Sequence, residues 1–411
     1  MVNSLSENPV AALDAEEQLR YARHLVLPEI GLEGQRKLRR ASVLVIGAGG
    51  LGSPALLYLA AAGVGRLGVI DPDRVELSNL QRQVLYDTAS CGIAKVEQAR
   101  DRLCALNPHL RIDVYPEPFD LANAASLVAA YDVIVEGSDQ FATKYLVNDA
   151  CVLARKPYIG ASIRAFSGML SVYAAPDGPC YRCLFPEMPD PATIPSCAQA
   201  GVLGTVPGLF GTLQAHEALK LILGIGEPLI GALLTVDLLA MRFQKLRLPR
   251  DSSCPVCGDA PTIRALAETR FACANAADSQ PVPATEPLAD DLPWLDVETS
   301  RQRSSLRWID IRTQAEFDAG HIPGAAHVPS EQLERFAAGV GTDEQFLLYC
   351  QRGGRTIQAY HLLKETLSGR LWLLQGGYEA WLHDAFAASS SDRTARTANA
   401  SISASCNSCI G

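Results

Sequence analysis

The chain has 411 residues, of which 48% are hydrophobic and 20% charged, and its formal net charge is −9. This length exceeds the usual size of a single hydrophobic core, so more than one domain is expected. The negative charge argues against a nonspecific nucleic-acid partner. The chain has neither a signal-like start nor a long unbroken apolar run. We therefore expect a cytoplasmic protein with no nucleic-acid partner and no membrane partner.

The first half of the chain alternates strand and helix patterns in the way that a parallel α/β sheet does. An amphipathic helix is expected first, over Ala15–Leu27. Three strands, each followed by a helix, are then expected at Ser42–Ile46 with Gly50–Ala62, Arg66–Ile70 with Ala94–Leu106, and Tyr131–Val135 with Phe141–Ala154. Tyr158–Ser162 and Met169–Ala174 extend this sheet with mixed pairing, before a long helix near Gly208–Leu223. The pattern predicts an α/β fold with a Rossmann-like, mostly parallel sheet.

A glycine-rich turn follows the first strand. Gly47, Gly49 and Gly52 fit the spacing G-x-G-x-x-G, with Gly50 inside the turn, and Asp71 ends the second strand. Glycines of this spacing allow a tight turn that aims a helix N-terminus at a phosphate. The motif alone is the dinucleotide fingerprint, so an NAD-binding domain is one interpretation.

Polar residues at the ends of the later strands favour ATP. Arg82, in the polar run Asp71–Gln83, and Lys95 on the next helix supply fixed positive charge for a triphosphate. Asp71 can accept hydrogen bonds from ribose hydroxyls. Asp139 follows the third strand, where a carboxylate can hold magnesium against the phosphates. Taken singly, Asp139 could instead be a solvated loop aspartate, and Lys95 could be a surface lysine.

Two C-x-x-C pairs indicate a metal site. Each pair, Cys180 with Cys183 and Cys254 with Cys257, can place two thiolates on one ion. Tetrahedral zinc with no open position suits four such ligands, so a structural zinc is expected, with a redox dithiol or unlinked core cysteines as alternatives.

The chain has 12 cysteines, and the neighbouring residues in the sequence indicate the roles of several others. Cys197 follows a proline-rich stretch and has turn-forming, polar neighbours, so it is a candidate for chemistry. Cys91, Cys104 and Cys151 lie in apolar or helical patterns and are expected to be small buried hydrophobic residues. Cys406 and Cys409 form a third C-x-x-C pair. This pair could relay sulfur, bind a metal or occur by chance in a disordered tail.

The last third of the chain contains four ordered motifs, at Trp308–Arg312, Ala315–Ala325, Phe346–Thr356 and Leu374–Trp381. With these motifs, this part of the chain resembles a rhodanese domain. A strand ends at Cys350, and a loop with glycines and two arginines leads into a helix at Thr356–Leu367. Backbone N–H groups of such a loop form an anion cradle that stabilises a thiolate or persulfide. An inactive module is the alternative. The expected domains are residues 1–260, a linker at 261–303, the rhodanese domain at 304–386 and a flexible tail at 387–411.

The first part resembles the MoeB and ThiF family, the adenylating enzymes that activate ubiquitin-like sulfur carriers. The resemblance covers about residues 15–260 and rests on ordered motifs: Tyr21–His24, Gly47–Pro54, Asp71–Gln83, Lys95, Asp139 and the cysteine pairs. It implies that Asn79, Arg82 and Lys95 contact the phosphates, that Asp139 holds Mg²⁺, and that the four cysteines hold Zn²⁺. It also implies that Arg23 reaches into the nucleotide site of a partner subunit, which makes the unit a homodimer.

Together the two resemblances imply one reaction sequence. The first domain transfers AMP from ATP to the C-terminal glycine of a ubiquitin-like sulfur-carrier protein that ends in Gly-Gly. A Cys350 persulfide, loaded by thiosulfate or a cysteine desulfurase, then supplies sulfur for the thiocarboxylate. The loop cysteine Cys197 forms a thioester or resolves an acyl-disulfide. An NAD-dependent oxidoreductase with an accessory rhodanese module, and a non-catalytic scaffold, are the alternative functions.

Overall fold

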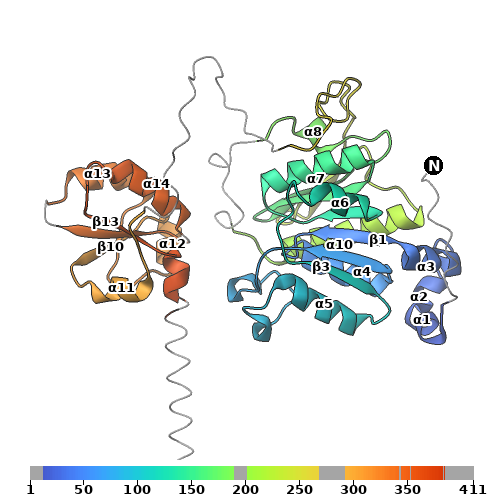
Figure 1. The fold of residues 1–411 in the computed structure, drawn as a ribbon, viewed down its shortest axis with the longest axis horizontal. Coiled ribbons are helices and arrows are strands. Elements are labelled where there is room, and N and C mark those ends of the chain that lie inside the picture. The colour runs from blue at the N-terminus through green and yellow to red at the C-terminus, as the bar shows by residue number, and fades with distance from the viewer. Residues whose placement is uncertain are drawn as a thin grey trace, which may run out of the picture. The chain divides into compact units, whose positions relative to one another are not determined.

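The computed structural model describes residues 13–188, 201–267, 292–341, 344–351, 353–382 and 384. The chain forms two compact units, Met1–Asp278 and Ser279–Gly411 (Figure 1), which are described separately. Cys197, Cys406 and Cys409 lie outside the described residues. Among the described helices, none is both long enough and apolar enough to cross a membrane.

An eight-stranded sheet forms the centre of the first unit, in the order β3-β2-β1-β4-β5-β6-β7-β8. The strands are β1 Ser42–Ile46, β2 Arg66–Ile70, β3 Arg111–Tyr115, β4 Val133–Glu136, β5 Tyr158–Arg164, β6 Ser167–Tyr173, β7 Ala232–Asp237 and β8 Arg242–Arg247. Pairing is parallel from β3 through β5 and antiparallel from β5 through β8. The predicted mostly parallel sheet with a mixed edge is confirmed.

Helices cover both faces of the parallel part of this sheet. Figure 1 shows α6 and α7 on one side and α4 and α5 on the other. The central strand β1 is apolar after Ser42, which suits a strand that is buried on both faces. Val43 and Val45 pack in one core cluster, while Leu44 and Ile46 pack in another. The helices of this unit are α1 Ala15–Arg20, α2 Ala22–Leu25, α3 Gly31–Arg40, α4 Gly52–Ala62, α5 Lys95–Leu106, α6 Ala124–Ala129, α7 Phe141–Ala154, α8 Tyr181–Leu184 and α10 Thr205–Leu223, with the 3₁₀ turns η1 Leu77–Asn79 and η2 Thr88–Ser90.

Some expectations for this unit differ from the structure. The single helix expected over Ala15–Leu27 is broken at Tyr21, whose buried ring packs on Gly63 and whose hydroxyl accepts a hydrogen bond from Asn107 Nδ2. Cys151 is buried as expected, but Cys91 and Cys104 are exposed, so their assignment to the core is wrong. Cys104 lies on the solvent face of α5, where helical spacing alone did not identify the face.

The second unit contains a five-stranded parallel sheet in the order β11-β10-β12-β13-β9. Its elements are β9 Trp294–Leu295, α11 Val297–Gln302, β10 Leu306–Asp310, α12 Gln314–Asp318, β11 Ala326–His327, η4 Ser330–Gln332, α13 Leu333–Ala338, β12 Gln345–Tyr349, α14 Gly354–Leu363 and β13 Leu371–Leu374. In the central strand β12, Phe346 and Leu348 face one core cluster and Leu347 and Tyr349 the other. The smaller α/β domain predicted for this part of the chain is confirmed.

Candidate functional site

The turns that follow β1, β2 and β4 meet at one edge of the first sheet. Gly47 N donates to Ile70 O at 2.9 Å, and Gly137 N donates to Ile46 O at 2.8 Å. β1 pairs with β2 on one side and with β4 on the other, so the sheet order reverses direction here. In open α/β sheets, ligands bind in the crevice at such a point.

The glycine turn is too crowded for side chains. A Cβ on Gly52 would lie 1.9 Å from Gly47 O, and Gly47 has a φ of +89°. A Cβ on Gly50 would lie 3.1 Å from Pro207 Cβ, at the start of α10. Around Gly49 the space is more open, since Gln83 Nε2 is 3.7 Å from the position of a Cβ. The backbone can therefore approach a phosphate closely, and α4 begins directly at Gly52.

Asp71 and Lys95 lie together beside this turn. The two carboxylate oxygens of Asp71 accept from Ala48 N at 2.8 Å and Asp73 N at 2.9 Å. Lys95 Nζ lies 2.8 Å from Asp73 Oδ2 and 3.9 Å from Asp71 Oδ1. Burial raises the pKa of Asp71, although Lys95 and the two backbone donors oppose this shift. The structure thus brings Lys95 and Asp71 to the turn as expected.

Arg82 and Asn79 come from the polar segment after β2. Arg82 is half-buried, and its Cγ lies 3.5 Å from the position of a Cβ on Gly50. Its guanidinium donates to Ser78 O at 3.1 Å. Asn79 is buried, and its side-chain oxygen accepts from Glu76 N at 3.4 Å. The segment therefore places a cation beside the glycine turn.

Asp139 is exposed on the turn between β4 and α7. Within the described chain, no side chain pairs with its carboxylate, so both oxygens are available as ligands of the kind that magnesium prefers. Arg23 is exposed on α2, and it too makes no ion pair with a described residue. The structure does not bring Arg23 into contact with the other candidate residues of the same chain.

Cys197 lies outside the described residues, but the chain that follows it is described. Val202 bridges to Ala165 in the turn between β5 and β6. A Cβ on Gly204 would lie 2.1 Å from Gln81 O. The chain therefore passes from the β5–β6 turn to the polar segment beside the glycine turn.

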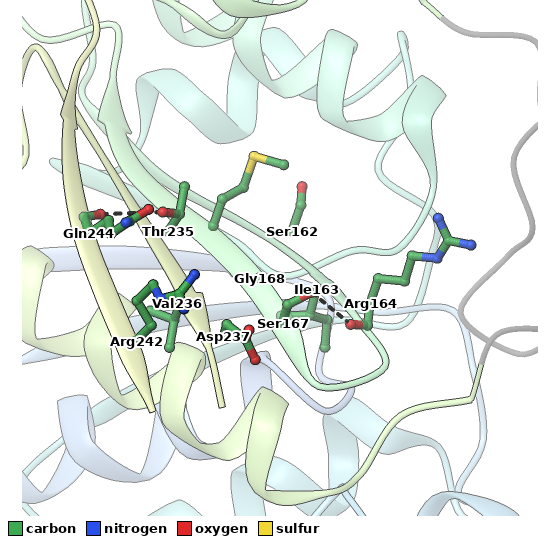
Figure 2. A pocket seen from close by; sticks show the side chains of 11 residues that line it. Ser162, Ile163, Arg164, Ser167, Gly168, Thr235, Val236, Asp237, Arg242 and Gln244 are labelled. Carbon is green, nitrogen blue, oxygen red and sulfur yellow. Dashed lines mark hydrogen bonds between the residues drawn. The ribbon is translucent and has the colours of Figure 1, made fainter. Parts of the chain in front are cut away.

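A shallow hollow of about 450 Å³ covers the antiparallel part of the sheet (Figure 2). The register aligns Ser162, Met169, Thr235 and Gln244 across the four strands β5 to β8 on one face. A second row on the same face consists of Arg164, Ser167, Asp237 and Arg242. The carboxyl ends of β5 and β7 lie in this hollow, so it opens at the same edge of the sheet as the glycine turn.

The two cysteine pairs converge at the end of the first unit. Cys180 Sγ lies 3.5 Å from Cys254 Sγ, and Cys183 Sγ lies 3.3 Å from Cys257 Sγ. All four sulfur atoms lie within 4.8 Å of one another. Tetrahedral zinc–thiolate geometry requires sulfur separations of about 3.8 Å, so the cluster could bind a metal ion. Hydrogen bonding with Cys180 and Cys257 lowers the pKa of the Cys183 thiol, although Cys254 opposes this shift.

In the second unit, Cys350 begins the loop that leads into α14. Its Sγ accepts from Gly353 N at 3.1 Å, and the side chain is buried. A Cβ on Gly377 would lie 2.4 Å from Cys350 O, and Tyr378 N donates to that oxygen at 2.9 Å. The Gly376–Gly377 turn thus holds the backbone of the loop.

Ion pairs hold the cations around this loop. Arg355 Nη1 and Nη2 lie 2.9 and 2.7 Å from the two carboxylate oxygens of Glu316. Partial burial opposes the charge of Glu316, but hydrogen bonds from Arg355 and Thr313 outweigh it and lower the pKa of Glu316 to about 2. The Glu316 hydrogen bond and the nearby Cys350 raise the pKa of Arg355. Arg312 forms a buried pair with Asp310, which agrees with a bracing role.

Residues 21–256 match the model of the ThiF family, and residues 294–384 match the model of the rhodanese-like domain. A probable adenylyltransferase/sulfurtransferase, MoeZ of Mycobacterium tuberculosis, is 42% identical over 91% of this chain and 95% of its own length. The sulfur carrier protein adenylyltransferase of Thermus thermophilus is 52% identical over 63% of this chain and 97% of its own length.

This chain belongs to the ThiF family. A pig protein named adenylyltransferase and sulfurtransferase MOCS3 is 44% identical over 80% of this chain and 72% of its own length. A crystal structure of E. coli MccB shares the fold, with a TM-score of 0.51 and 24% identity over 59% of this chain and 74% of that chain. The chain is therefore an adenylyltransferase joined to a sulfurtransferase domain, and the adenylating enzymes of this family use ATP.

Metal binding by the four cysteines can be tested by removing one ligand. Cys254→Ala leaves three thiols, so metal content should fall from about one ion per chain to a small fraction of that, and the melting temperature should fall with it. Elemental analysis and thermal unfolding measure the two effects. Cys104→Ala, at an exposed position outside the cluster, is the matched control. Unchanged metal content in the Cys254 variant would refute the assignment.

Proposed function

We propose that this protein adenylates the C-terminal glycine of a ubiquitin-like sulfur-carrier protein and then converts it to a thiocarboxylate. The carrier carboxylate attacks the α-phosphorus of ATP, and pyrophosphate leaves. The similarity to the sulfur carrier protein adenylyltransferase of Thermus thermophilus supports this substrate. The observation that carries the proposal is the convergence of Lys95, Arg82 and the glycine turn at the reversal point of the sheet.

Charge neutralisation and positioning carry the adenylation step, because no covalent enzyme intermediate is required. We assign the β- and γ-phosphates to Arg82, Lys95 and Asn79, and the ribose side to Asp71. Asp139 would hold Mg²⁺, which neutralises phosphate charge when bound. Lys95 is paired with Asp73 in the structure, so it is already held at the crevice at little further entropic cost.

A homodimer is proposed because Arg23 and its surroundings suit a subunit interface. Leu19, Val26 and Leu27 expose large apolar side chains on and next to α1 and α2, and Leu19 is 79% exposed. Such a patch marks an interaction surface. Arg23 lies among these residues, where it would reach the nucleotide site of the partner subunit. Zn²⁺ is the proposed ion of the four-cysteine cluster, where it would fasten α8 to residues 254–257.

The hollow over β5 to β8 is the proposed docking surface for the carrier. Leu246 lies on the same face of β8 as Gln244 and is 48% exposed. The glycine turn follows β1, and adjacent strands lie about 4.8 Å apart, so four strand spacings separate β1 from β7 by about 19 Å. An extended tail of about six residues covers that distance. A folded carrier seated in the hollow would thus place its last glycine at the glycine turn.

Sulfur transfer follows at Cys350. The terminal sulfur of a Cys350 persulfide attacks the acyl-adenylate carbon, and AMP leaves. Cys197 is proposed to attack the resulting acyl-disulfide, which frees the thiocarboxylate and leaves a disulfide for an external thiol to reduce. Thiosulfate or a cysteine desulfurase would load the persulfide. Gly353 N and the N-terminus of α14 support this role because they offer positive dipoles to the sulfur.

The adenylation site is tested by charge reversal. Arg82→Glu and Asp139→Lys should each lower carrier-dependent ATP–pyrophosphate exchange by about 100-fold or more, because each loses stabilisation of phosphate charge. A purified ubiquitin-fold carrier ending in Gly-Gly is the substrate. Arg111→Glu, an exposed change at the opposite end of the strands, is the control. Full exchange in the two site variants, or nicotinamide oxidoreduction by the wild type, would contradict the proposal.

The docking surface has a matched pair of variants on one strand. Leu246→Glu should raise the KM for the carrier about tenfold or more while kcat changes little, because ground-state binding is lost. Phe243→Glu is the control, since Phe243 is similarly exposed, at 50%, but lies on the opposite face of β8. Equal KM values for the two variants would exclude this face of β8 from the docking surface.

The division of labour between the domains is tested at Cys350. Cys350→Ala should reduce thiosulfate:cyanide sulfur transfer to below about 1% because the nucleophile is lost, while ATP–pyrophosphate exchange remains. Both activities are measured on the full chain, with Cys104→Ala as a control for loss of an unrelated thiol. Equal loss of both activities in Cys350→Ala would contradict the assignment.

A further inference from the structure

A buried ion pair lies directly behind the turn that carries Asp139. Glu136 is the last residue of β4 and is 1% exposed, and Lys144 on α7 is 7% exposed. Lys144 Nζ lies 2.5 Å from Glu136 Oε2 and also donates to Ala161 O of β5 at 2.8 Å. The pair therefore joins β4, β5 and α7 at one point. Neither charge belongs to the nucleotide or metal contacts described above.

The other oxygen of Glu136 holds the turn itself. Glu136 Oε1 accepts from Ser138 N at 2.8 Å and from Ser138 Oγ at 2.6 Å. Ser138 immediately precedes Asp139, so two hydrogen bonds fix the residue that sets the direction of the Asp139 carboxylate. Gln214 Nε2 on α10 also donates to Glu136 O at 2.6 Å. Both the side-chain carboxylate and the backbone carbonyl of Glu136 therefore help to fix the turn.

The pair is enclosed, so water cannot readily replace it. Glu136 and Lys144 line a cavity of only about 10 Å³, which Tyr158, Tyr173 and Tyr181 also border. A cavity of this size has room for about one water molecule. Removing one partner would leave an uncompensated buried charge, and the hydrogen bonds to Ser138 would then reorganise.

We propose that Glu136 and Lys144 are positioning residues that aim Asp139 at the nucleotide-bound magnesium ion. This inference rests on the magnesium role proposed for Asp139. The ion pair fixes the Glu136 carboxylate, the carboxylate fixes Ser138, and Ser138 fixes Asp139. The phosphate contacts of Arg82 and Lys95 come from other segments, so the pair governs the metal requirement and leaves metal-free nucleotide binding unchanged.

The test uses the full-chain protein and a non-hydrolysable ATP analogue. Calorimetry gives the Mg²⁺ concentration for half-maximal enhancement of analogue binding. Glu136→Gln should raise this concentration on the order of tenfold, because a misdirected ligand loses about one charged contact. Analogue affinity without Mg²⁺ should change less than about twofold, because Arg82 and Lys95 keep their places. Amide hydrogen exchange of a peptide covering 137–140 should become faster.

Ser138→Ala is the milder variant, because it removes one hydrogen bond to Glu136 and leaves the buried pair intact. It should raise the Mg²⁺ requirement by about two- to fivefold, the effect of one ordinary hydrogen bond. This variant keeps the inference testable if Glu136→Gln does not fold.

A second buried ion pair on the same helix is the matched control. Asp149 on α7 accepts from Arg182 Nε and Nη2, each at 2.8 Å, and both residues are buried. Asp149→Asn breaks a pair of similar burial that does not contact the Glu136–Asp139 turn. It should lower the melting temperature but leave the Mg²⁺ requirement unchanged.

An equal rise in the Mg²⁺ requirement for Asp149→Asn would overturn the inference, since the effect would then be a general loosening of α7. An unchanged requirement in both Glu136→Gln and Ser138→Ala would also overturn it. Failure of the proposed function has a different signature. In that case the wild-type protein would show no carrier-dependent pyrophosphate exchange, while the calorimetric comparison would still decide the role of Glu136.

Discussion

The contact between the turns after β1 and β4 is the constraint on which the first unit depends. Gly52 lies against Gly47 O, and a Cβ on Gly47 would lie 3.0 Å from Gly137 O. Any side chain at these points would separate the two strands where the sheet order reverses. The absence of side chains here also lets the backbone come close to a bound phosphate. Packing of the turn and the proposed nucleotide binding therefore both require glycines.

Much of this architecture could be predicted from the sequence, because the spacing of apolar residues and the positions of turn-forming residues indicate the same elements. β1, β2 and α7 have the predicted bounds, since each carries the apolar pattern of its element up to a turn residue or a polar segment. β3 and β8 gave weaker signals, because one is half-buried at the edge and the other is exposed along its whole length. At the break in the first helix, Tyr21 contacts Gly63 and Asn107, which are distant in sequence, so no local pattern indicated these contacts.

The candidate site was predictable where residues follow a motif and not where tertiary packing decides. Asp71, Arg82 and Lys95 lie beside the glycine turn as expected, because each follows a strand that ends at this edge. Glu136 and Lys144 could not be singled out, because eight residues separate them and their pairing requires the packing of α7 on β4. A lysine within an otherwise apolar stretch of a predicted helix was the one available signal.

The two sites that we propose to hold an anion differ in the distribution of charge around them. In the first unit, Arg82 and Lys95 lie beside the glycine turn, where the proposed triphosphate would need positive charge, and Lys95 is also paired with Asp73. In the described part of the second unit, Arg355 is neutralised by Glu316 and Arg312 by Asp310. At Cys350, Gly353 N donates to the sulfur and α14 begins at the next residue, so both offer positive dipoles to that atom, while Arg355 lies close enough to interact with it.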